Sequence, residues 1–456
     1  MDKQEKTADL GTGSIGKLMV RLAIPMVMAQ LINVLYNMVD RMYIGNIEGI
    51  GATALTGVGV TFPIILIISA FSAFVGTGGA PLASIKLGEG NRKGAEEILG
   101  TGVAMLAVLS AVLMAFFFVF RQPMLLAFGA SENTIGYAME YITIYLIGTP
   151  FVQFALGLNP YISAQGNART AMLSVLIGAV LNIVLDPIFI FGFDMGVSGA
   201  ALATILSQAA SAVWVVCFLA GKKSTIRLRP SRIRLNPQRI GKIAALGISP
   251  FIMQATESLV QVVLNRGMLQ YGGDLYVGTM TIILSVSQLF IVPISGFTNG
   301  IHPILSYNFG AKKFDRVRET FKKTLVVTLI LSTLATVLTE LFPQAFVRMF
   351  NSDPQLVELT CKGMRIYMAG VFMFGIQMAC QAAFLSLGQA RLSLVSALMR
   401  KVVLLVPLAL IFPHFLGVNG VYLAEPVADI GAAIFIGVLF VLNFEKILAR
   451  RAKEDV

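Results

Sequence analysis

Apolar runs follow one another along almost the whole chain, and only short polar segments separate them. Each run holds about 20 residues or more, the length that a helix needs to cross the hydrocarbon core of a bilayer. Hydrophobic residues make up 56% of the chain and charged residues 13%, whereas a soluble protein carries about 25% charged residues. The pattern therefore predicts an all-α polytopic membrane protein.

We expect about twelve spanning helices, since that many runs have the required length. Their expected ranges are 17–44, 51–80, 96–119, 137–160, 171–193, 196–219, 243–269, 277–300, 320–342, 365–388, 392–412 and 417–444. An even number of spans places both termini on the same side of the membrane.

The net charge of +11 is carried by short basic segments between the apolar runs. The segment after the sixth run has no acidic residue among its basic ones, which are Lys222, Lys223, Arg227, Arg229, Arg232, Arg234, Arg239 and Lys242. Because cytoplasmic loops are enriched in Lys and Arg, we predict that this segment and both termini are cytoplasmic. This distribution does not indicate a nucleic-acid partner. A role of the segment in binding lipid headgroups stays open.

Short motifs of the first half recur in the second half at a nearly constant offset. The pairs are Pro81–Gly88 with Pro303–Gly310, Gly166–Arg169 with Gly388–Arg391, and Gly196–Gly199 with Gly417–Gly420. The repeat predicts two pseudo-symmetric six-helix lobes, 1–222 and 243–456, joined by a basic cytoplasmic linker, 223–242. Parallel repeats of this kind occur in secondary transporters, which bind their cargo near mid-membrane.

Asp186 lies in the apolar run 172–193, although a charged group at the bilayer centre costs about 2.5–3.5 kcal/mol. Asn182 precedes it by four residues, so both side chains lie on one face of a helix. Pro187 has no backbone N–H, so it donates no helical hydrogen bond to the carbonyl group of Ile183, and this leaves a further oxygen free. The oxygen-rich notch predicts a binding place for a small cation or a proton. The alternative is a pairing that serves helix packing only.

The first helix carries a polar stripe, because Asn33, Tyr36, Asn37 and Asp40 share one of its faces. We expect Pro25 to kink this helix and to act as a hinge. The stripe is a candidate surface for cargo, with Asn33 and Asn37 among its ligands, and Asp40 is a candidate for ion coupling.

The seventh helix carries a second polar stripe, with Gln254, Glu257 and Gln261 as candidates for cargo binding. Glu257 has three open roles, namely binding a cationic cargo, taking up a proton and pairing within the bundle. Met26 lies near the first stripe and suits an adaptable binding surface, with ordinary core packing as the alternative. Glu425 and Asp429 lie four residues apart in the twelfth helix, and no role is assigned to them.

The repeat places Leu404 and Leu408 at the positions of Asn182 and Asp186. The scaffold therefore does not require the polar pair, and we predict that ion coupling belongs to the N-terminal lobe. The charges that we place at mid-membrane are mainly acidic, namely Asp40, Asp186, Glu257 and Glu425, which favours cationic cargo.

Several of these features resemble the multidrug and toxic compound extrusion (MATE) family, over about residues 18 to 444. The resemblance rests on the two sets of six helices and on local motifs, namely Pro25 with Tyr36, Asp40–Gly45, Gly166–Arg169, Asn182-x3-Asp186-Pro187 and Gly199–Thr204. The stretch Ala424–Asp429 looks like the MepA-like branch of bacterial drug exporters.

The resemblance implies a V-shaped pair of lobes and the efflux of organic cations and drugs, driven by inward Na+ or H+. It implies a cation site at Asp40, Asn182, Asp186 and Thr204, with Tyr36 beside it; these residues are metal ligands if the ion is Na+. For Thr204 alone, a bond to its own helix is the alternative. A branch of the family has a second site with an acid in the tenth helix, but Tyr367–Leu387 holds no acid here.

We therefore expect a cation-coupled antiporter that exports cationic or amphipathic drugs and toxic organic compounds across a bacterial plasma membrane. It is expected to be a monomer among membrane lipids, to need no cofactor besides the coupling ion H+ or Na+, and not to be an enzyme. The alternative is a flippase for lipid-linked saccharides on a related fold, which needs a cationic cavity. A membrane enzyme needs a nucleophile, metal cluster or nucleotide motif, and the sequence shows none.

Overall fold

The computed structural model describes residues 10–350 and 353–454, and throughout these residues the regular structure is helical, without strands. Ten helices are long and apolar enough to cross a membrane, and two bent helix pairs bring the number to twelve. The predicted all-α architecture with twelve spans is confirmed.

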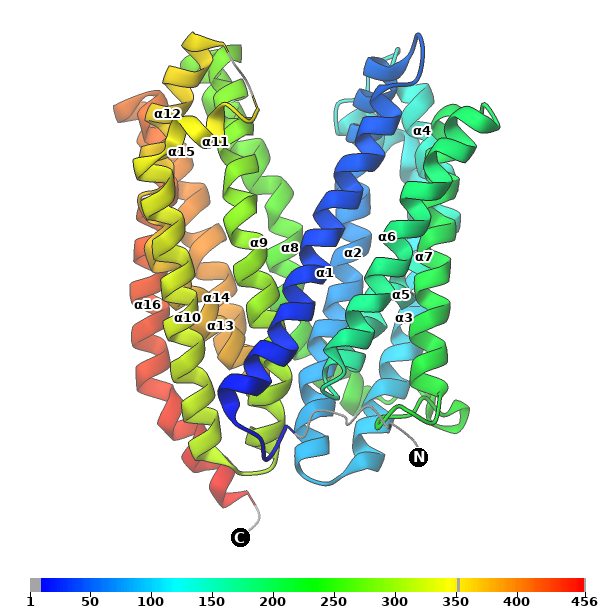
Figure 1. Ribbon diagram of the computed structural model, residues 1–456, viewed down its shortest axis with the longest axis vertical. Coiled ribbons are helices and arrows are strands. Elements are labelled where there is room, and N and C mark those ends of the chain that lie inside the picture. Colours follow the sequence, from blue (N-terminus) through cyan, green and yellow to red (C-terminus); the bar gives the residue numbers. More distant parts are fainter. Residues whose placement is uncertain (1–9, 351–352, 455–456) are drawn as a thin grey trace.

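The first half of the chain forms one lobe and the second half forms the other (Figure 1). The N-terminal lobe contains α1 (Ile15–Gly45), α2 (Gly51–Gly88), α3 (Arg92–Ala127), α4 (Ile135–Ile147), α5 (Thr149–Ser163), α6 (Ala168–Pro187), the π-helical η1 (Ile188–Gly192) and α7 (Gly196–Ala220). The C-terminal lobe contains α8 (Pro237–Gly272), α9 (Asp274–Gly310), α10 (Phe314–Leu341), α11 (Pro343–Val347), α12 (Pro354–Met368), α13 (Val371–Ser386), α14 (Ala390–Leu398), the π-helical η3 (Met399–Leu405), α15 (Val406–Leu416) and α16 (Val418–Lys453).

Two of the expected spans are bent rather than straight. The span made by α4 and α5 bends by 60° and the span made by α12 and α13 bends by 44°. In the first, Gly148 separates the helices and Pro150 follows in the first turn of α5. Since proline lacks an N–H and restricts the residue before it, the sequence itself explains this break.

The lobes pack against each other at one end and separate toward the other end (Figure 1). Glycines of α8, α2 and α9 allow the backbones to approach closely at the joined end. A Cβ added at Gly247 of α8 would lie 1.9 Å from the carbonyl oxygen of Phe74 on α2. A Cβ added at Gly88 of α2 would lie 2.0 Å from the carbonyl oxygen of Tyr307 on α9. The start and end of the described chain lie at this same end. In the turn between α9 and α10, Lys313 donates a hydrogen bond to the carbonyl oxygen of Gly11, and Lys312 donates one to the carbonyl oxygen of Ala452.

A methyl group at Gly247 is expected to weaken the contact between the lobes. Gly247→Ala should lower the free energy of unfolding by about 1–3 kcal/mol, the usual cost of overpacking, as measured by thermal unfolding in detergent. Gly241→Ala on the same helix is the control, because its added Cβ meets no atom within 4 Å. That control should be neutral or slightly stabilising. Equal destabilisation by both variants would contradict the importance of this contact.

The segment between α7 and α8 is folded onto the N-terminal lobe. Gln165 accepts hydrogen bonds from Ser224 Oγ, Thr225 N and Ile226 N at 3.0, 2.6 and 3.0 Å. The buried carboxylate of Glu96 in α3 pairs with Arg229 and Arg232. The basic segment is thus held by acidic partners, and its last part, from Pro237, already belongs to α8.

Candidate functional site

Asn182 and Asp186 on α6 are a deeply buried polar pair of the N-terminal lobe, 1% and 0% exposed. Asn182 Nδ2 donates to Asp186 Oδ1 at 3.1 Å, as their spacing of one turn allows. The same amide lies 3.5 Å from Thr204 Oγ1 on α7. The carboxylate, amide and hydroxyl therefore form one continuous polar cluster between two neighbouring helices.

Helix α1 adds Asp40 and Tyr36 to this cluster. The carboxyl groups of Asp40 and Asp186 interact directly, and the Tyr36 hydroxyl lies within electrostatic range of both. The structure thus brings together all five residues of the expected coupling site. It also places Tyr141 of α4 against Thr204 and facing Asp40. Tyr141 was not predicted as a site residue, since a tyrosine in an apolar run is equally common in a packed core.

Three oxygens of the cluster lack a hydrogen-bond partner among the described residues. They are Asp40 Oδ1, Asn182 Oδ1 and Asp186 Oδ2, and all three are buried. A buried acceptor without a partner costs about 1–3 kcal/mol, and a charged one costs more. A hard cation prefers carboxylate, amide and hydroxyl oxygens, and a proton shared by the two acids would relieve their repulsion. The cluster fits either occupant.

A cavity of about 250 Å³ opens beside this cluster. Tyr36, Asn182 and Thr204 belong to both the cluster and the cavity wall, and Met26 and Asn33 extend the wall along α1. Helix α9 of the other lobe completes the wall with Asn299, His302, Pro303 and Ser306. Because both lobes contribute, a relative movement of the lobes changes the shape of the cavity.

Other expected site residues lie elsewhere. Asn37 is exposed and donates to the carbonyl oxygen of Asn33 within its own helix. Gln254, Glu257 and Gln261 lie on α8 of the C-terminal lobe, and none of them lines this cavity. Pro25 is buried, and α1 continues through it without a break.

The predicted set of mid-membrane charges omitted two bases, because Arg400 and Lys401 are buried in the C-terminal lobe. Arg400 Nε donates to Asp429 Oδ1 at 2.6 Å, and Nη2 donates to Glu425 Oε1 at 2.5 Å. Lys401 Nζ pairs with the carboxylate of Glu257. The two basic residues interrupt a long apolar run in the sequence and were detectable there by the high cost of charge in a membrane.

Leu404 and Leu408 pack against apolar core residues of the C-terminal lobe. The positions that correspond to Asn182 and Asp186 in the repeat are therefore apolar in the structure as well. Leu404 also lies in η3, whose π-helical turn shifts the residues after it around the helix axis. The oxygen-rich notch of α6 has no copy at these positions.

The family model of MatE matches residues 25–188 and 250–411, one match in each lobe. The chain belongs to the MatE family. It is similar to two curated proteins named multidrug export protein MepA. The one from Staphylococcus haemolyticus is 24% identical over 427 residues, covering 94% of this chain and 93% of the relative. The one from Staphylococcus aureus strain N315 is 23% identical over 441 residues, covering 96% and 97%.

The fold is that of solved MATE structures. A crystal structure of a MATE in the bent conformation superposes with a TM-score of 0.92 at 24% identity, covering 98% of this chain and 99% of the other. One in the straight conformation has a TM-score of 0.90 at 24% identity, covering 97% and 99%. The predicted pair of six-helix lobes and the resemblance to this family are thus confirmed.

Proposed function

We propose that this protein is an antiporter that exports cationic and amphipathic organic compounds in exchange for H+ or Na+. The observation that carries the proposal is the set of unpartnered oxygens of Asp40, Asn182 and Asp186 beside a cavity of about 250 Å³. The names of the curated relatives, multidrug export proteins, support the same conclusion.

Ion and cargo compete through shared residues in this proposal. Tyr36, Asn182 and Thr204 contact the ion cluster and also line the cavity. An ion on the carboxylates neutralises the charge that attracts a cationic cargo, so each ligand lowers the affinity for the other by the same factor. Because α1 carries both Asn33 and Asp40, a bend at Pro25 would change the cavity and the ion site together.

The charge of the site favours cations. Among the described residues that line the cavity, none is Lys or Arg, and the acidic groups of the neighbouring cluster are Asp40 and Asp186. Arg400 and Lys401 are each bound to carboxylates in the other lobe. A flippase for lipid-linked saccharides needs free cations for a diphosphate group, so it is the less supported alternative.

The distribution of basic loops supports a plasma-membrane orientation with both termini in the cytoplasm. In that orientation the lobes join at the cytoplasmic side and separate toward the outside (Figure 1). We further propose that the monomer is the working unit, because each chain contains both lobes and a complete cavity.

Filling the cavity tests where cargo binds. Val175 lines the cavity, whereas Leu173 on the same helix is exposed on another face. Val175→Trp should weaken binding of the monocationic dye rhodamine 6G by roughly tenfold or more in a fluorescence-polarisation titration. Leu173→Trp, the matched control, should leave the affinity within a factor of about two. Unchanged binding by folded Val175→Trp protein would contradict the placement of cargo in this cavity.

A further inference from the structure

Five charged side chains meet inside the C-terminal lobe. Arg400 and Lys401 come from η3, Glu257 comes from α8, and Glu425 and Asp429 come from α16. Tyr367 of α12 lies within electrostatic range of the group. With every group charged, three carboxylates face two cations. Charges this deep in a membrane protein are costly and are usually connected with function.

The two cations have different partners. Arg400 is shared by Glu425 and Asp429 of α16, and its guanidinium also lies 5.0 Å from the ring centre of Phe374. Lys401 Nζ instead reaches α8, where it pairs with Glu257 and donates to the carbonyl oxygen of Met253 at 2.8 Å. The arginine therefore pairs with α16, and among the described residues the ion pair of Glu257 is with Lys401.

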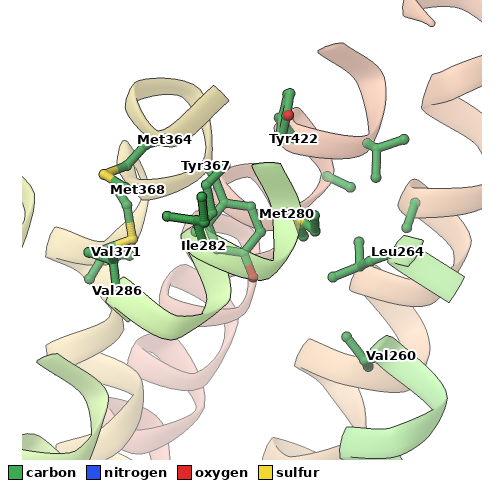
Figure 2. Packing of buried hydrophobic residues seen from close by; sticks show 14 of the residues in the cluster. Val260, Leu264, Met280, Ile282, Val286, Met364, Tyr367, Met368, Val371 and Tyr422 are labelled. Atoms are coloured by element: carbon green, nitrogen blue, oxygen red, sulfur yellow. The ribbon is translucent and has the colours of Figure 1, made fainter. Parts of the chain in front are cut away.

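The Lys401–Glu257 pair is unevenly exposed. The Lys401 side chain is 10% exposed, whereas that of Glu257 is 40% exposed. Val260 and Leu264 follow Glu257 on the same face of α8 and belong to a buried cluster with Met280 and Tyr367 (Figure 2). Glu257 thus lies at the edge of the packed face of α8, and the ammonium group of Lys401 lies on the buried side of its carboxylate.

The part of α8 that carries Glu257 lies beyond the contact between the lobes. Phe251 on α8 still contacts Phe71 and Phe74 of α2, with ring centres 4.9 and 6.1 Å apart. Glu257 is six residues further along α8, or about 9 Å along the helix axis, toward the end at which the lobes separate (Figure 1). A carboxylate exposed to lipid is highly unfavourable, so the exposed part of Glu257 is expected on the aqueous side.

A second anion is available to Lys401. Glu425 lies within electrostatic range of both Glu257 and Lys401. Its Oε1 accepts from Arg400, but its Oε2 is buried without a hydrogen-bond partner among the described residues. The side chain of Glu425 is only 8% exposed. If Lys401 leaves Glu257, the buried Oε2 of Glu425 is therefore available as an acceptor for its ammonium group.

We propose that Lys401 pairs with Glu257 when no cargo is bound, and that a cationic cargo must displace the lysine toward Glu425 in order to bind. Lys401 would then set the affinity for organic cations at the C-terminal wall of the space between the lobes. This inference rests on the proposed export of cationic cargo and adds a contact outside the N-terminal cavity. It identifies a specificity-determining residue that acts by competition.

Removing the competing charge tests the inference. Lys401→Met should raise the affinity for rhodamine 6G roughly fivefold, the value of one partly exposed ion pair. Adding Glu257→Gln to Lys401→Met should abolish the gain. The uncharged dye Nile red should show no gain in either variant. Lys362→Met is the matched control, since it removes a lysine paired with Glu358 at the surface of the same lobe, and it should not change binding.

A further variant keeps the test decisive if Lys401→Met does not fold. Glu425→Gln removes the acceptor for the displaced lysine but leaves Arg400 paired with Asp429, and it should weaken rhodamine 6G binding. Unchanged affinity in folded Lys401→Met protein, or a gain that survives Glu257→Gln, would overturn the inference while the proposed function stands. Wild-type protein that binds no rhodamine 6G would contradict the proposed function itself.

Discussion

Asp40→Asn and Asp186→Asn, made separately, should each abolish gradient-driven dye export. Either change removes one of the two carboxylates that share the buried cluster, so the remaining groups no longer bind a cation or a proton with the required strength. We expect the rate of ethidium efflux from cells to fall to that of cells without the transporter. Expression and detergent extraction should remain normal, because neutralising a buried acid removes an unpaired charge.

The control for these variants is Asp315→Asn, which neutralises a fully exposed carboxylate in the first turn of α10. It should export dye at the wild-type rate, since an exposed ion pair contributes little. Normal efflux by either Asp40→Asn or Asp186→Asn would remove that residue from the coupling mechanism.

Arg400→Met should cause the largest loss of stability among single substitutions in the C-terminal lobe. It leaves the buried carboxylates of Glu425 and Asp429 without their shared partner, and breaking a buried pair in this way costs about 3–5 kcal/mol. Thermal unfolding of the purified protein in detergent measures the effect. Arg318→Met is the matched control, because Arg318 also bridges two acids, Asp315 and Glu445, but at the surface.

The loss should be reversed by removing the acids as well. Arg400→Met combined with Glu425→Gln and Asp429→Asn leaves no unpaired charge, so most of the stability should return. If Arg400→Met alone unfolds like the wild type, the ion pairs do not hold α16 to η3. If the triple variant is as unstable as the single one, the arginine acts through packing instead.

The fold was predictable because the membrane imposes simple rules. A helix must be long and apolar to span the bilayer, and the repeated motifs revealed two lobes. The bends at Gly148 and between α12 and α13 were not predicted, because the expected spans were defined by apolar length alone. The proline at position 150 was visible, but apolar length is equally satisfied by a straight and by a bent span.

The N-terminal cluster was predictable for a related reason. Asp186 stands out in an apolar run, and Asn182 lies one turn away on the same helix. The charged group of the C-terminal lobe was only half recognised, since its acids were noted but Arg400 and Lys401 were not. Their partners come from α8 and α16, far apart in sequence, and only tertiary packing shows which acid each cation binds.

The central claim, that ion binding in the N-terminal lobe drives export, is tested most directly in proteoliposomes that contain the purified protein and rhodamine 6G. Inward Na+ and proton gradients are imposed in turn, with a membrane potential alone as the control. We predict dye export under at least one of the two ion gradients, and its loss in Asp40→Asn and Asp186→Asn protein. Export that is equally fast without any ion gradient, or that both variants retain, would contradict the claim.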